Sequence, residues 1–251
     1  FENETQEIKL DVIHNIFYDW NGGISLHYKN SEVAAQGEEA FTPPSKTQTL
    51  ALGLMEEKHF GEVLLQLGAR IEQVKLTADN VLLPSLEAHS HEESEEDEHD
   101  HDHGLEEETS STRVYAVDHK FTPVSLSAGL VWDFAPGYNL GLSISRSERA
   151  PSASELMSFG PHIGTGSYEI GALFKSASNG GIVGLTDEVI DLETANNIDL
   201  ELRKTQGDIA FVFNAFYNQV DNYYYQSFSG LYAESGHNHG EEEHDHDHSE
   251  E

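Results

Sequence analysis

The sequence predicts an all-β fold, namely a segment of an antiparallel transmembrane β-barrel with about eight strands and long external loops. Apolar and polar residues alternate with a period of two along most of the chain, which is typical of strands with two different faces. Every second connection between the alternating segments is long, and aromatic residues gather near the segment ends. Transmembrane barrels share both properties.

The alternation is clearest in residues 124–134 and 138–145, where apolar residues face Ser, Gly, Asn and Asp. A soluble β-sandwich would also alternate, but a face rich in Ser, Gly and Asn suits a wet barrel interior. Residues 112–134 are predicted as one strand, with Pro123 above the bilayer or at a bulge, because splitting them would break the order of short and long connections. The predicted strands are 5–14, 22–33, 46–58, 62–76, 112–134, 138–148, 194–205 and 209–228.

The long connections all fall on one side of the predicted sheet. We expect residues 1–251 to form a partial barrel domain, with external loops at 34–45, 77–111, 149–193 and 229–251. The loops 77–111 and 229–251 are rich in His and acidic residues. Both chain ends would lie on the external side, and no closing strand is predicted, so we expect an internal slice of a larger barrel.

The charge of the chain is concentrated in two segments. The formal net charge is −33, and residues 89–108 and 234–251 together hold 19 of the 46 acidic residues and 10 of the 15 His, with no Lys or Arg. This field argues against a nucleic-acid partner and favours cations. The chain has no Cys, which excludes thiolate zinc sites, and it has no apolar run long enough for a transmembrane helix.

Three segments resemble TonB-dependent outer-membrane receptors: residues 37–45, residues 131–142 and Ser-Arg-Ser-Glu-Arg-Ala-Pro-Ser at 145–152. The stretch at 160–171, which begins Gly-Pro-His-Ile-Gly-Thr-Gly, is similar, together with residues 193–200, to the zinc-uptake (ZnuD-like) branch of that family. Residues 172–190 depart from the family pattern by an insertion.

The resemblance implies a 22-stranded barrel in the outer membrane of a Gram-negative bacterium, in contact with outer-membrane lipid and with extracellular loops. It also implies an N-terminal plug, through which the TonB complex would act. The plug is absent from this sequence, so its metal ligands cannot be named. No catalytic constellation or phosphate-binding loop is found, and we therefore expect a transporter and not an enzyme.

The two charged segments carry the residue types that bind zinc. In an extended chain, His-x-His places two imidazoles on one side, and imidazole and carboxylate groups are both zinc ligands. Incidental His in solvated acidic loops is the alternative, but a solubilising acidic run does not need ten His. The predicted metal ligands are His89, His91, His99, His101, His103, His237, His239, His244, His246 and His248, with possible carboxylate partners Asp100, Asp102, Asp245 and Asp247.

His162 is a separate candidate. It lies in a segment shaped by Gly and Pro, and the resemblance implies that it is a ligand of a discrete transport site; a loop-packing role is the alternative. Glu38 and Glu39 are possible carboxylate partners. The isolated His14, His27, His59 and His119 are predicted to be ordinary strand or turn residues, and Arg149, Ser152 and Glu155 to order the barrel rim.

The sequence therefore predicts a TonB-dependent receptor that takes up zinc, with His/Asp/Glu-rich external loops that capture the ion. A receptor for another cargo, such as a metal chelate, haem, copper or nickel, is one alternative, because imidazole ligands do not exclude copper or nickel. A metal-buffering surface β-protein without transport activity is another.

Overall fold

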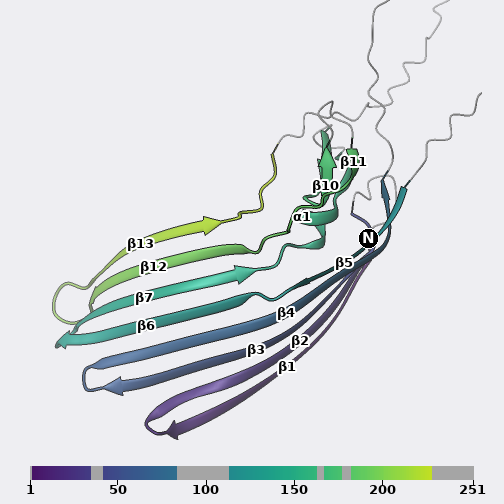
Figure 1. Ribbon diagram of the computed structural model, residues 1–251. Coiled ribbons are helices and arrows are strands. Elements are labelled where there is room, and N and C mark those ends of the chain that lie inside the picture. The colour runs from purple at the N-terminus through teal and green to yellow at the C-terminus, as the bar shows by residue number, and fades with distance from the viewer. Residues whose placement is uncertain (1, 35–41, 84–112, 163–166, 177–181, 228–251) are drawn as a thin grey trace, which may run out of the picture.

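The computed structural model describes residues 2–34, 42–83, 113–162, 167–176 and 182–227, which form a curved antiparallel sheet with a small folded unit at one end (Figure 1). Among these residues, no helix is long and apolar enough to cross a bilayer. The elements in chain order are β1 (Glu2–Phe17), β2 (Trp20–Ala34), β3 (Ser45–Phe60), β4 (Val63–Leu83), β5 (Arg113–Phe121), β6 (Val124–Ala135), β7 (Tyr138–Arg149), α1 (Ala153–Met157), β8 (Phe159–His162), β9 (Ser167–Ile170), β10 (Phe174–Ser176), β11 (Ile182–Leu185), β12 (Glu193–Lys204) and β13 (Phe211–Asp221).

The sheet confirms the predicted all-β antiparallel architecture. Its order is β1-β2-β3-β4-β6-β7-β12-β13, and β5 also pairs with β4. Residues 63–71 of β4 pair with β6, and its later residues pair with β5, so β5 and β6 lie end to end along one neighbour. The break falls at Pro123, which has no N–H to donate to the ladder, although its carbonyl accepts from the Glu72 N–H at 2.9 Å. Residues 113–135 therefore occupy one position in the sheet, as predicted for 112–134.

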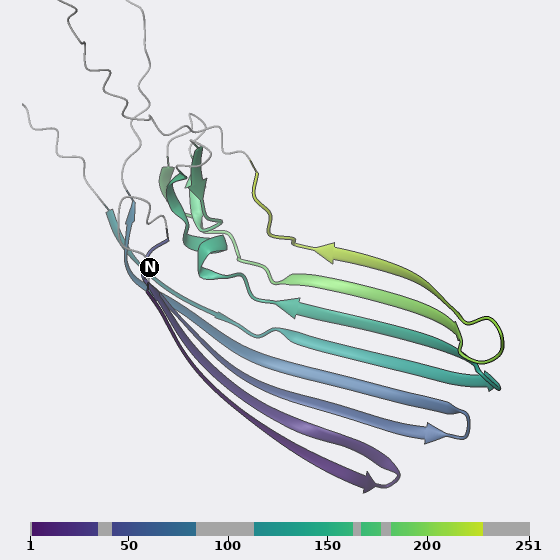
Figure 2. The same ribbon diagram turned by 180° about the vertical axis from the view of Figure 1, so that it is seen from behind.

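The short connections lie at one end of the sheet and the long ones at the other, as Figures 1 and 2 show. The tight turns are β1–β2, β3–β4 and β6–β7, and the slightly longer β12–β13 connection lies at the same end. Gly61 and Gly137 have φ of 62° and 75° in these turns, a conformation that glycine adopts without steric cost. The predicted alternation of short and long connections is confirmed for the described strands; that the long end is external stays a prediction.

The structure departs most from the predicted organisation in three places. Residues 77–83 were expected to begin the loop 77–111, but they continue β4, because this extension pairs with β5 and buries Ala78 and Val81. The last strand ends at Asp221 and not at residue 228, and the Asn222 side-chain amide donates to the Leu192 carbonyl at 3.3 Å. The predicted loop 149–193 contains α1 and four short strands.

The two faces of the sheet differ in polarity, since successive side chains point to opposite sides of each strand. One face carries exposed aliphatic side chains and is called the apolar face here. The opposite, polar face carries small and polar residues, and a hollow of about 990 Å³ includes Ser25, Gly53, Arg70 and Ser127 in its lining. Members of the apolar face are Ile8, Leu10, Ile24, Leu26, Leu50, Leu52, Leu54, Ile71, Leu126, Leu130, Leu142, Ile144, Ile198 and Leu200.

Strand β4 changes character along its length. On one side of the strand, Gln66 and Arg70 are followed by Val74, Leu76 and Ala78, all buried to 6% exposure or less. The buried apolar residues on this side lie beyond Ile71, where the exposed aliphatic band of the other side ends. The extension of β4 therefore turns an apolar surface inward, and the folded unit covers it.

Leu142 and Ser143 are neighbours on β7 with side chains on opposite faces, which makes them a matched pair for testing the faces. If the apolar face contacts lipid, as expected for a barrel, Leu142→Lys destabilises the full-length protein by about 2–4 kcal/mol near the bilayer midplane. Ser143→Lys, on the wet face, changes stability by less than about 1 kcal/mol. Urea unfolding in lipid vesicles measures both, and equal losses in the two variants would contradict the assignment of the faces.

Candidate functional site: a folded module at the sheet edge

The folded unit at the long-connection end, here called the rim module, comprises the described residues between 150 and 192. Leu156, Met157, Leu173 and Phe174 from the module form one core with Leu76, Val81, Val117 and Phe121 from β4 and β5. Leu156 and Met157 are fully buried. Burial of this kind stabilises by about 1.5–3 kcal/mol for each large side chain. The segment that carries the Gly-Pro-His motif is therefore attached to the sheet by an apolar core.

The turn around α1 is held by a capping box. The Ser152 hydroxyl accepts from the Glu155 N–H at 3.2 Å, and the Glu155 carboxylate accepts from the Ser152 N–H at 2.7 Å. Both donors would otherwise lack partners at the start of the helix. The next segment packs directly on this turn, because the Leu173 N–H donates to the Leu156 carbonyl at 3.0 Å and a Cβ on Gly171 would lie 2.2 Å from that carbonyl oxygen. Only glycine fits at position 171.

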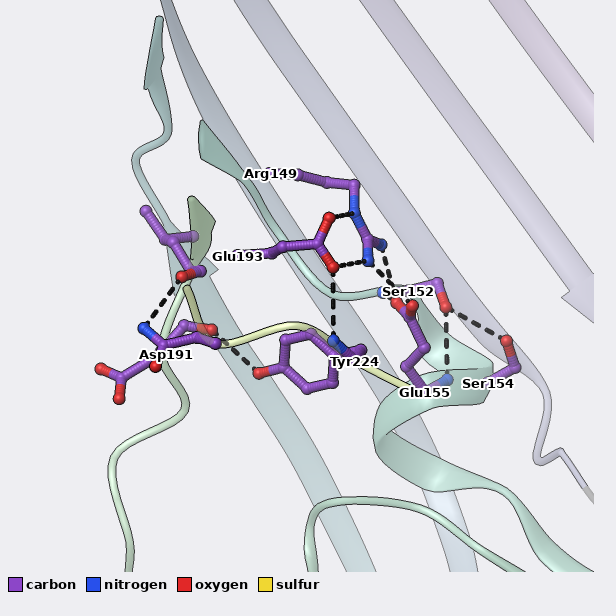
Figure 3. Close-up of polar contacts among 9 residues, drawn as sticks. Arg149, Ser152, Ser154, Glu155, Asp191, Glu193 and Tyr224 are labelled. Carbon is purple, nitrogen blue, oxygen red and sulfur yellow. Dashed lines mark hydrogen bonds and ion pairs between the residues drawn. The ribbon is translucent and has the colours of Figure 1, made fainter. Parts of the chain in front are cut away.

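Arg149 joins the rim module to the sheet. Its guanidinium donates to both oxygens of Glu155, at 2.9 and 3.0 Å, and to both oxygens of Glu193, at 3.1 and 2.8 Å. Figure 3 shows Arg149 between the two carboxylates, one from the α1 turn and one from the start of β12. Paired donors of this kind fix geometry as well as adding charge attraction. The prediction that Arg149, Ser152 and Glu155 order the rim agrees with these contacts.

The electrostatics of the cluster favour its charged state. The hydrogen bonds that Arg149 donates to Glu193 and Glu155 raise the pKa of Arg149, and the hydrogen bond that Glu193 accepts from Arg149 lowers the pKa of Glu193. Burial of Glu155 opposes its ionisation, but hydrogen bonds from Arg149 and Ser152 outweigh it, and its pKa is lowered. Burial raises the pKa of Tyr224, so this phenol stays neutral at physiological pH.

Tyr224 extends the cluster to the segment after β13. Its N–H donates to Glu193 at 3.3 Å and its hydroxyl donates to the Asp191 carbonyl at 2.9 Å (Figure 3). Tyr223 and Tyr225 are exposed, and their rings stack 6.3 Å apart. Through its contacts, Tyr224 belongs to the cluster that joins the rim module to the sheet. No sequence pattern marks Tyr224 or Glu193 as members of the cluster. Their contacts form only when the fold brings residues 149, 193 and 224 together.

The β8–β9 hairpin of the rim module carries His162. Phe159, at the start of β8, packs its ring edge-on against Phe174 with centroids 5.6 Å apart, so the hairpin begins in the apolar core. The register pairs Phe159 with Ile170 and His162 with Ser167. The backbone of His162 is thus placed on a strand anchored at its other end; its side chain lies outside the described atoms.

The other predicted ligands fall outside the described residues. These are all ten histidines of the two charged segments, with Asp100, Asp102, Asp245 and Asp247, and also Glu38 and Glu39. Within the described part of the chain, no group of three or more His, Asp or Glu is arranged to hold a metal ion.

Three of the isolated histidines make ordinary strand contacts, in keeping with their predicted role. His14 Nε2 lies 2.8 Å from a Glu56 carboxylate oxygen. His27 Nε2 lies 2.9 Å from Glu7, and its Nδ1 lies 3.4 Å from Arg70. His119 stacks on the Phe121 ring with centroids 6.0 Å apart.

Replacing Arg149 tests whether the cluster anchors the module. Arg149→Met removes four charge-assisted hydrogen bonds, which are partly exposed and therefore individually weak. We expect amide hydrogen exchange in residues 153–160 and 171–174 to become about tenfold faster, while the core of the sheet is unchanged. Hydrogen exchange measured by mass spectrometry checks this, with Arg203→Met, at the opposite end of the sheet, as control; unchanged exchange in the module would contradict the anchoring role.

The same cluster predicts an acid-sensitive module. Because the folded state lowers the pKa of Glu155 and Glu193 below their ordinary value of 4.5, their contribution to stability is fully present above that pH. It is lost as the pH falls through the lowered values. Exchange protection of the module should therefore stay constant from about pH 7 to pH 5 and fall below about pH 4.5. A fall in protection at the same pH in Arg149→Met, which lacks the guanidinium that lowers both pKa values, would contradict the cluster's role.

A family model and a solved structure both match this chain. The model of the family described as "TonB dependent receptor-like, beta-barrel" matches residues 3–239. The solved structure of a double mutant of the Serratia marcescens hemophore receptor HasR, in complex with its hemophore HasA and heme, matches with a TM-score of 0.54 and 14% sequence identity. The match covers 88% of this chain and 33% of that one, so the chain spans about a third of the receptor's length. At this identity the likeness concerns the fold.

The family match covers nearly the whole chain, and the antiparallel sheet agrees with it. Barrels of this family lie in the outer membrane of Gram-negative bacteria and belong to transport receptors, not enzymes. The chain belongs to the family of TonB-dependent receptor-like β-barrels.

Proposed function

We propose that the full-length protein takes up zinc across the outer membrane as a TonB-dependent receptor of the ZnuD-like branch. The observation that carries the proposal is the pair of segments at 89–103 and 237–248, each with five His among acidic residues. Imidazole and carboxylate groups bind Zn²⁺, and neutral imidazole predominates at pH 7. Segments of this composition offer many imidazole and carboxylate ligands, so they would hold several ions and raise the local concentration of the metal.

The order of the strands supports the proposal that the two His-rich segments and the rim module lie at the same end of the sheet. Strand β4 ends at Leu83, before the first His-rich segment, and β5 begins at Arg113, after it. The second segment follows Tyr224 in the sequence, and Tyr224 donates to Glu193 at the start of β12. The described residues next to both segments therefore lie at the end of the sheet that carries the rim module (Figure 1).

His162 is proposed as a ligand of the selective site. Its strand starts in the apolar core at Phe159, and an anchored strand fixes backbone direction better than a free loop does. Further ligands would come from the plug and from other parts of the receptor, and the TonB complex would act through the plug. Glu38 and Glu39 precede β3, which begins at the same end of the sheet, and they are proposed carboxylate partners.

Haem is the competing cargo. The HasR structure was determined with heme, and HasR has the same fold in the part that this chain matches. A His in a rim hairpin is chemically able to ligate haem iron as well as zinc. The dense carboxylates of the two segments favour a small dication over haem, whose own propionates are anionic.

Uptake of radioactive zinc by receptor-null cells carrying the full-length receptor tests the proposal. His162→Ala, and deletion of residues 89–103 with 237–248, should each lower the uptake rate at limiting zinc by about tenfold, the usual scale for losing metal-site groups. His59→Ala, an exposed His at the opposite end of the sheet, is the matched control and should transport normally. Zinc uptake equal to that of receptor-null cells in the unaltered receptor would overturn the proposal. If the same cells then grow on haem as sole iron source, haem is the cargo.

A further inference from the structure

The apolar face ends in a row of aromatic residues at the short-turn end. The Trp132 and Phe134 rings lie with centroids 5.6 Å apart, and the Phe134 and Tyr138 rings 5.8 Å apart. The register then pairs Lys204 of β12 with Tyr138 of β7 on one side and with Phe211 of β13 on the other. Directly paired residues share a face, so Lys204 lies within this aromatic row.

Lys204 terminates a column of apolar side chains. Ile198, Leu200 and Leu202 precede it on the same face of β12, and Ile198 and Leu200 are 49% and 40% exposed. The ammonium lies 5.6 Å from the Tyr138 ring centroid and 3.6 Å from the place that a Cβ on Gly207 would take in the adjacent turn. The charge is therefore held at the end of the strand, where a lipid headgroup would meet the apolar column.

A second lysine at the short-turn end, Lys58, has the acidic partner that Lys204 lacks among the described residues. Lys58 lies over the Trp20 and Phe60 rings at 5.8 and 5.4 Å, and it also donates to the Tyr18 carbonyl at 3.0 Å and pairs with Asp19 at 3.6 Å. Its charge is balanced within the chain. Lys204 has the same aromatic setting, but among the described residues no carboxylate forms an ion pair with it.

We propose that Lys204, with Tyr138 and Phe211 beside it, binds the phosphate of a phospholipid headgroup whose acyl chains lie along Leu202 and Leu200. An ammonium beside apolar surface needs an anionic partner, and a phosphate offers strong acceptor oxygens. In membrane proteins aromatic side chains are enriched at headgroup depth. The exposed Leu200 and the half-buried Leu202 offer apolar surface to acyl chains. Charge, aromatic setting and apolar column all meet at this one residue of a strand that is paired on both sides.

Native mass spectrometry of the full-length receptor with added phosphatidylglycerol tests the site. Lys204→Met should weaken the tightest lipid binding about fivefold, whereas Lys204→Arg should keep it, since one interfacial cation contributes a factor of this order. Lys58→Met is the matched control at the same short-turn end, and this variant should bind phosphatidylglycerol as the unaltered receptor does. Diacylglycerol, which lacks the phosphate, should not distinguish the variants.

Three results would overturn the assignment. Unchanged phosphatidylglycerol affinity in Lys204→Met would remove the site, and an equal loss in Lys58→Met would show a general effect of positive charge. A loss of diacylglycerol binding as large as that of phosphatidylglycerol would show that the phosphate is not recognised. The arginine variant guards against misfolding, because it keeps the charge and the stem at position 204.

Discussion

The register of β4 is the constraint on which the rest of the structure depends. A slip of one residue would move Arg70 to the apolar face and would expose Leu76 and Ala78, so a single register satisfies both ends of the strand. In that register the first half of β4 joins the two-faced sheet, and the second half offers an apolar surface to the rim module. The module is thus specified by the same alternation that specifies the sheet, continued beyond the exposed aliphatic band.

Acidic residues are paired with a cation in the Arg149 cluster, but not in the sequence of the two His-rich segments. At the rim, Arg149 brings two carboxylates together, and each becomes easier to ionise because the same guanidinium donates to both. In the segments 89–108 and 234–251 the sequence has no Lys or Arg at all, so their carboxylates have no cation of their own nearby in sequence. This contrast, between a rim module ordered by internal ion pairs and two acidic segments without Lys or Arg, underlies the proposed division between anchoring and collecting.

Much of the fold was predictable from the sequence, because strand alternation is a local signal that pairing reinforces. The eight positions across the sheet, the shared position of residues 113–135 and the common end of the long connections all follow from it. The predicted end of β4 was wrong, because Ala78 and Val81 are buried against a module that periodicity alone could not place. The roles of Glu193 and Tyr224 depend on contacts between distant residues, and no local pattern marks them. The ligand set of the proposed zinc site is also non-local, so the sequence could name His162 but not its partners.

We propose that the rim module places the His162 imidazole where zinc is selected. X-ray absorption at the zinc edge tests this in the full-length receptor, loaded with one equivalent of zinc after removal of the two His-rich segments. We expect nitrogen and oxygen ligands with imidazole scattering, at about 2.0–2.1 Å, and we expect His162→Ala to reduce the imidazole contribution and the retained zinc. Identical spectra and identical retained zinc in the two proteins would contradict it.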